Sequence, residues 1–346
     1  MKTLLKLLLK TQHHQNHSGL AKTEKGMTLV ELLVGAIMAF LIITPMLGFV
    51  VDMLNTDRRE QVKSNTEQDL QAAVDFIAQD LSQAIYIYDR AGITAINNTT
   101  NKLPAAGDAT KIPILVFWKR QQIKNTLPIN NLIKPNKCDE PANVNKCNDT
   151  YVLSLVAYYQ FKDNDPTWCQ PSGGTCPTRI ARYEIRDGVR NPYATDPADT
   201  YYSLSDIDKS KTRDAAFNQD FDFSKPTENV TTGAGFQNPQ VLVNYIDHTN
   251  NPQTALLGTE CTTALGNPTD PKDSTKKLDE TTLRVTDSAT NSFYACVDTA
   301  KNIARVTIRG NSLRRLQPND ADFKTTSSAF FPTATVQVQG LGALGK

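Results

Sequence analysis

The run LLVGAIMAFLIITPMLGFVV, from Leu32 to Val51, decides how this chain is built. It holds twenty residues without a charge. As a helix with a rise of about 1.5 Å per residue it would be about 30 Å long, the thickness of the hydrocarbon core of a bilayer. We therefore expect a transmembrane helix over residues 27–51. A cleaved secretory signal would have a shorter apolar run followed by a small-residue cleavage site.

The segment before this run is basic. Residues 1–26 carry five lysines against one acidic residue, Glu24. Lysine-rich flanks of a membrane helix stay on the cytoplasmic side. The sequence thus predicts a single-pass protein of the inner (cytoplasmic) membrane, with its N-terminus in the cytoplasm and its body exported to the periplasm or the cell exterior.

One carboxylate, Glu31, lies at the edge of the apolar run. A charged side chain at the centre of a bilayer costs about 2.5–3.5 kcal/mol on insertion scales, so such groups usually have a partner. In one interpretation Glu31 reaches toward the lipid headgroups. In the other, cleavage after Gly26 frees the α-amine of Met27, and a carboxylate at position 31 neutralises such an amine on a neighbouring subunit.

The stretch KGMTLVELL, from Lys25 to Leu33, resembles the class III leader site of type IV pilins and type II secretion pseudopilins. The resemblance implies that residues 1–26 are a leader peptide, which prepilin peptidase removes between Gly26 and Met27 before Met27 is N-methylated. It also implies that Glu31 docks the subunit during assembly. The implied partners are prepilin peptidase, an inner-membrane assembly platform, the membrane, and other minor and major pilins or pseudopilins. A plain membrane anchor with a chance glutamate is the alternative.

The helix is expected to continue beyond the membrane, over residues 52–90. No Gly or Pro occurs from Asn55 to Asp89. One helical face carries an apolar stripe, made of Leu70, Val74, Ile77, Leu81 and Ile85. The stripe is too short for a coiled coil, so it predicts a helix packed against a globular head. The string AVDFIAQDLSQA, from Ala73 to Ala84, is similar to the corresponding helix of large minor pseudopilins placed near a filament tip.

Residues 91–346 are expected to form a β-rich head. Short runs rich in Val, Ile, Tyr and Phe are bounded by turn residues, as in antiparallel sheets. The predicted strands are Ile112–Trp118, Tyr151–Phe161, Arg179–Ile185, Gln240–Asp247, Ser292–Val297, Ile303–Arg309 and Ala334–Gln339. The predicted fold class is α+β: a long N-terminal transmembrane-to-amphipathic helix packed on an antiparallel β-rich head, which the family resemblance implies is pilin-like.

Two segments near the C-terminus carry a second resemblance. They are NIARVTIRGNSLRRLQ, from Asn302 to Gln317, and AFFPTATVQVQGLG, from Ala329 to Gly342. Both resemble the end of pseudopilins linked to hormogonium polysaccharide secretion in filamentous cyanobacteria. That resemblance implies a subunit of a pilus-related machine that exports polysaccharide for gliding motility.

The six cysteines point to an oxidising compartment, in agreement with an exported head. They allow 15 pairings, among which sequence alone cannot choose. Proximity suggests three disulfides, Cys138 with Cys147, Cys169 with Cys176, and Cys261 with Cys296. A zinc site is disfavoured because the spacings do not match the usual pairs of zinc ligands.

Composition argues against several kinds of chemistry. The formal net charge is +1, which gives no support to general nucleic-acid binding. Of four histidines only His248 lies in the body of the chain, and no G-x-S-x-G motif occurs. We expect no enzyme activity, no catalytic residue and no metal centre. The C-terminal GLGALGK, from Gly340, lacks the helix that a phosphate loop requires and is interpreted as a flexible tail.

Calcium is the one cofactor whose binding the sequence does not exclude, because calcium needs only oxygen ligands. Four acidic groups are candidates, although Asp and Asn also favour turns: Asp163-Asn164-Asp165, Asp220 with Asp222, Asp270 with Asp273, and Asp320 with Asp322.

Two further groups of side chains have alternative interpretations. Aromatic residues could form a stacking platform for sugars or single-stranded DNA, although strand aromatics usually belong to a core. They are Tyr158, Tyr159, Trp168, Tyr201 and Tyr202. Four arginines are interpreted as a solvated face, with binding of an acidic polymer or DNA as the alternative. They are Arg305, Arg309, Arg314 and Arg315.

The functional expectation is a minor pilin or pseudopilin. Such a structural subunit initiates or caps a type IV pilus-like filament that serves secretion, including that of polysaccharide, or motility. The alternative is a head displayed by the filament as an adhesin or as a receptor for DNA or polysaccharide.

Overall fold

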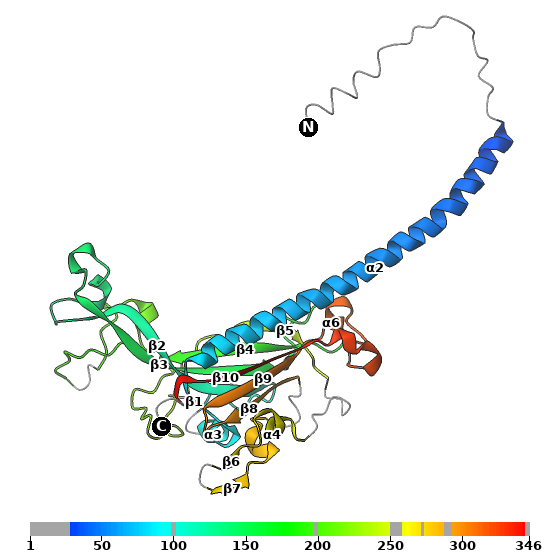
Figure 1. Ribbon diagram of the computed structural model, residues 1–346. Helices are drawn as coiled ribbons and strands as arrows, with labels where there is room; N and C mark the ends of the chain where they lie inside the picture. The colour runs from blue at the N-terminus through cyan, green and yellow to red at the C-terminus, as the bar shows by residue number, and fades with distance from the viewer. Residues whose placement is uncertain are drawn as a thin grey trace, which may run out of the picture. The chain divides into compact units, whose positions relative to one another are not determined.

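Helix α2, Leu29–Ser82, is a single helix of 54 residues and the first element of the computed structural model (Figure 1). The structure describes residues 28–97, 102–196, 200–249, 258–270, 273–286 and 292–342. The expected leader, residues 1–26, and the expected cut between Gly26 and Met27 lie outside the described residues. The chain divides into two units, residues 1–57 and 58–346.

In the first unit, residues 32–51 of α2 carry no charge, and every side chain of this part of the helix is exposed. This part of the helix is long and apolar enough to cross a membrane. Pro45 and Gly48 lie inside it without interrupting the helix.

In the second unit, α2 contributes to the core of the head. The predicted stripe is buried at Leu70, Val74, Ile77 and Leu81. The helix was expected to reach residue 90, and that expectation is wrong, because α2 ends at Ser82 and strand β1, Ala84–Ile87, follows. The run Ala84–Tyr88 alternates β-branched and aromatic residues, which favour a strand. Its backbone pairs with strand β2, where Tyr86 lies opposite Trp118.

The described residues of the head form three antiparallel sheets (Figure 1). A five-stranded sheet has the order β1-β2-β3-β4-β5 and a three-stranded sheet the order β10-β9-β8. The larger sheet adds β2, Lys111–Pro128, β3, Cys147–Phe161, β4, Thr178–Arg186, and β5, Gln240–Ile246. The smaller sheet contains β8, Phe293–Asp298, β9, Ile303–Arg309, and β10, Thr333–Gln339. A two-stranded sheet pairs β6, Thr269–Asp270, with β7, Asp273–Lys277. All seven predicted strands are confirmed.

Short helices connect these strands. The α-helical turns are α3, Arg90–Ile96, α4, Glu260–Ala264, α5, Glu280–Leu283, and α6, Leu313–Leu316. The 3₁₀ turns are η1, Pro135–Lys137, η2, Pro141–Asn143, η3, Lys209–Lys211, and η6, Thr325–Phe330.

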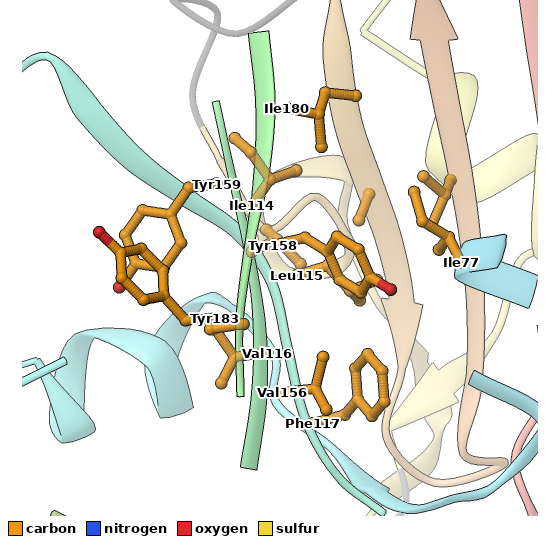
Figure 2. Packing of buried hydrophobic residues seen from close by; sticks show 14 of the residues in the cluster. Ile77, Ile114, Leu115, Val116, Phe117, Val156, Tyr158, Tyr159, Ile180 and Tyr183 are labelled. Carbon is orange, nitrogen blue, oxygen red and sulfur yellow. The ribbon is translucent and has the colours of Figure 1, made fainter. Parts of the chain in front are cut away.

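The five-stranded sheet is buried on both faces (Figure 2). On the face toward α2, Phe117 stacks on Tyr158 at a centroid distance of 6.3 Å, and Ile77 of the helix lies on the same side. On the opposite face, Tyr159 and Tyr183 meet edge to face at 5.2 Å. Buried residues of α2, of α3 and of the smaller sheet join those of the five-stranded sheet in one hydrophobic cluster.

The hairpin of β2 and β3 is longer than the sequence indicates. Its strands extend to Pro128 and Cys147, past the predicted limits at Trp118 and Tyr151. The added residues are polar and carry little hydrophobic alternation. A small separate cluster, made of Ile123, Val152, Val189, Tyr202 and Ile207, supports this part of the hairpin.

Three disulfides join the pairs that proximity suggests. They connect Cys138 with Cys147, Cys169 with Cys176, and Cys261 with Cys296, at Cα–Cα distances of 5.8, 5.0 and 5.3 Å. These distances fall in the usual range for a disulfide.

Candidate functional site

The N-terminus of α2 is closed by a reciprocal cap between Thr28 and Glu31. The Thr28 backbone N–H and hydroxyl donate to Oε2 of Glu31 at 3.0 and 3.1 Å, and the Glu31 N–H donates to Oγ1 of Thr28 at 3.3 Å. This is a capping box, in which two otherwise unpaired helix N–H groups find acceptors. The Glu31 carboxylate therefore stabilises the helix start directly before the apolar run.

The opposite end of α2 is fixed by a carboxylate, Asp80. Arg182 of β4 donates Nε–H to Oδ2 of Asp80 at 2.7 Å, and Tyr158 of β3 donates its hydroxyl to the same oxygen at 2.7 Å. Lys119 of β2 donates to Oδ1 at 3.0 Å. Three adjacent strands thus bind one helix carboxylate, which is 7% exposed.

A second carboxylate, Glu184, balances the charge of this cluster. It accepts from Arg182 at 2.8 Å and lies 3.2 Å from the Lys119 ammonium. Burial raises the pKa of Asp80, but hydrogen bonding and charge from Arg182, with the charge of Lys119, outweigh burial, so its pKa lies below 3.8. The pKa of Glu184 lies below 4.5, because Arg182 and Lys119 likewise outweigh the effect of burial. Two carboxylates and two basic side chains therefore form one ion-pair network at the end of α2.

Asn302, in the turn between β8 and β9, joins the two larger sheets. Its Oδ1 accepts from the Ile87 N–H at 3.1 Å, and its Nδ2 donates to the Ala84 carbonyl at 3.0 Å. The Gly340 N–H donates to the Asn302 carbonyl at 2.9 Å. The outer edge of β1 is thereby covered by the smaller sheet.

The C-terminal glycines pack against this junction. A Cβ on Gly340 would lie 2.3 Å from the Ala84 carbonyl oxygen, and one on Gly342 would lie 1.9 Å from that of Ile85. The interpretation of this stretch as a flexible tail is wrong as far as Gly342, because backbone contacts hold it. Residues 343–346 lie outside the described part of the chain.

Several of the acidic residues proposed for calcium already have hydrogen-bond or ion-pair partners. Asp163 pairs with both terminal nitrogens of Arg179. Asp165, Asp222 and Asp273 accept from the N–H two residues further along, as in an Asx turn. Among the residues that the structure describes, no three His, Cys, Asp or Glu side chains are grouped to hold a metal ion.

His248 and the aromatic residues are dispersed over the head. His248 Nε2 lies 2.9 Å from Oδ1 of Asp322. Tyr158 and Tyr159 are buried on opposite faces of the sheet. The five aromatics therefore do not form one platform, and the core interpretation holds for the two strand tyrosines.

The interpretation of the four arginines as a solvated face is wrong for three of them. Arg309 pairs with the buried Asp247 at 2.8 Å, and Arg315 pairs with Asp69 of α2. Arg314 is fully buried and donates to the carbonyls of Pro171, Gly173 and Thr175. Sequence reasoning missed these roles because each partner lies at least 60 residues away along the chain.

Comparison with family models, with curated proteins and with solved structures found no match. The grounds for a function are therefore the leader-site resemblance and the geometry of α2.

Proposed function

We propose that this chain is a minor pilin or pseudopilin, a structural subunit that initiates or caps a type IV pilus-like filament. The observation that carries the proposal is the construction of α2. One helix begins with the Thr28–Glu31 cap, continues as an exposed apolar span, and contributes its last turns to the core of a disulfide-bonded head. A subunit that is stored in a membrane and then packed into a helical bundle requires these parts.

The leader-site resemblance supplies the processing steps of the proposal. Prepilin peptidase cuts after Gly26, Met27 is methylated, and an inner-membrane platform adds the subunit to other pilins. The head is exported, in keeping with its three disulfides. The filament serves secretion or motility, and the C-terminal resemblance favours polysaccharide as the cargo. The chain acts as a structural component and not as an enzyme.

Glu31 has two roles in this proposal, and they can be separated. In the precursor it caps α2, and in the filament it pairs with the α-amine of a neighbouring Met27. Gln can also complete a capping box, so Glu31→Gln keeps the cap but removes the charge. Glu31→Ala removes both. Glu67→Ala, at an exposed site on α2, is the matched control.

The test measures each variant in the membrane and in filaments sheared from cells. We expect all three to insert normally, while Glu31→Ala and Glu31→Gln are lost from the sheared fraction and Glu67→Ala is retained. Normal incorporation of Glu31→Gln would contradict the charge-pairing role. Normal incorporation of both Glu31 variants would contradict docking by this residue altogether.

A receptor role for the head is the second candidate function. It is favoured by a surface hollow whose lining includes Asp69 of α2, Trp168 and Tyr245.

A further inference from the structure

A hollow of about 440 Å³ lies where α2, strand β5 and the loop after β3 meet. Ligand sites of small molecules usually have volumes of roughly 300–1,000 Å³. Asp69, from α2, Thr167, Trp168 and Gln170, from the loop, and Tyr245 and Arg315 contribute to its lining. Asp69, Thr167 and Gln170 are exposed, so a ligand in the hollow can reach their hydrogen-bonding groups.

Two aromatic side chains from different elements line this hollow. Trp168 is partly exposed, although tryptophan is usually highly buried. Tyr245 has a φ of 59°, a left-handed conformation that bulky residues rarely adopt. Its carbonyl accepts from the Asn311 N–H at 2.7 Å, which helps to hold this backbone. Unusual backbone of this kind is enriched at ligand-binding sites.

The loop that carries Trp168 is held in place before any ligand arrives. The Cys169–Cys176 disulfide closes it, and the guanidinium of the buried Arg314 donates to carbonyls of Pro171, Gly173 and Thr175. Asn244 of β5 donates Nδ2–H to the Trp168 carbonyl at 2.9 Å. A pre-ordered loop loses little conformational entropy on binding.

Arg315, which follows Arg314 in the chain, also lines the hollow. Its guanidinium lies over the Tyr245 ring, 4.5 Å from the centroid, and pairs with Asp69. Because the charges of Arg315 and Asp69 cancel, the hollow offers hydrogen-bond donors and acceptors but carries no net charge. A phosphate-rich polymer would meet the Asp69 carboxylate and gain little from an arginine that is already paired. A ligand rich in hydroxyl groups, with flat apolar ring faces, fits both the aromatic and the polar components.

We propose that this hollow is a saccharide-binding site, in which a sugar ring packs against Trp168 and its hydroxyls bond to Asp69, Gln170 and Arg315. The site goes beyond the proposed filament role and does not depend on it, because every residue involved belongs to the second unit, residues 58–346. A chain that failed to enter filaments could still bind sugar, and a subunit that assembled normally could lack this site.

The first experiment applies the full chain in detergent to an array of immobilised neutral, acidic and amino-sugar oligosaccharides, with an oligo-dT strand on the same surface. We expect selective retention on at least one oligosaccharide. Trp168→Ala should weaken that retention by at least about fivefold, the lower limit for loss of a stacking contact. Tyr151→Ala, at an exposed aromatic on β3, should not weaken it.

Intrinsic fluorescence provides an independent readout, because the chain has only two tryptophans. Trp118 is fully buried in the core and serves as the internal reference. The free sugar that corresponds to the retained oligosaccharide should shift the emission of the wild-type chain and leave that of Trp168→Phe unchanged. Retention of oligo-dT alone, absence of retention on every sugar, or equal retention by wild type and Trp168→Ala would overturn the proposal.

Discussion

Arg182 Nε donates a 2.7 Å hydrogen bond to Oδ2 of Asp80 across 102 residues of sequence. The bond connects the last turns of α2 to β4, and bonds from Lys119 and Tyr158 connect the same carboxylate to β2 and β3. The end of the helix cannot slide over the sheet without breaking all three contacts. This cluster therefore fixes residues 58–82 of α2 in one position against the five-stranded sheet.

Replacing Asp80 by Asn should destabilise the head strongly. The change leaves the buried Arg182 and Lys119 with only the partly exposed carboxylate of Glu184 between them, and breaking a buried ion pair costs about 3–5 kcal/mol. Urea unfolding of the full chain in detergent, followed by the fluorescence of the buried Trp118, measures the loss. Asp75→Asn, on an exposed face of the same helix, should cost less than about 0.5 kcal/mol. Equal effects of the two changes would contradict the role given to Asp80.

The same cluster predicts an acid-sensitive head. The pKa values of Asp80 and Glu184 are lowered in the folded chain, because Arg182 and Lys119 outweigh the opposing effect of burial. Such groups stabilise the fold above their unfolded pKa, and the contribution is lost as the pH falls through the lower folded pKa. The wild-type unfolding free energy should therefore fall between about pH 5 and pH 2, and the fall should be shallower in Asp80→Asn and in Glu184→Gln. Parallel pH profiles of all three chains would show that these carboxylates do not contribute.

Much of this architecture follows from local sequence patterns. The apolar stripe from Leu70 to Leu81 and the seven predicted strands depend on periodicity, which is a property of neighbouring residues. The Asp80–Arg182 bond and the burial of Arg314 depend on which distant segments meet, and periodicity carries no information about that. Ile85 continues the apolar stripe and so favours a helix over Ala84–Ile87, but pairing with β2 outweighs that local signal.

The three disulfides should contribute unequally. In the chain-entropy account, stabilisation grows with the length of the closed loop. Cys261 and Cys296 are 35 residues apart, whereas Cys169 and Cys176 are 7 apart. Replacing both cysteines of a pair by Ser should cost roughly 4 kcal/mol for the longer loop and roughly 2.4 kcal/mol for the shorter one. Urea unfolding of the two double variants tests this order, and the reverse order would contradict it.

Gly340→Ala should loosen the junction between the two larger sheets. The added Cβ would lie 2.3 Å from the Ala84 carbonyl oxygen and 2.5 Å from Nδ2 of Asn302, so backbone or side chain has to move. Overpacking of this kind costs about 1–3 kcal/mol. Gly258→Ala has open space around the new methyl group and serves as the control. Indistinguishable urea midpoints for the two variants would show that the glycine is not required there.

The measurement that tests the central claim most directly is the mass of the N-terminal peptide of the protein isolated from native membranes. The proposal predicts a mature chain that begins at N-methylated Met27, with residues 1–26 removed. A chain that retains Met1 and Lys2 would contradict processing as a pilin and would leave a single-pass anchor carrying an exported head.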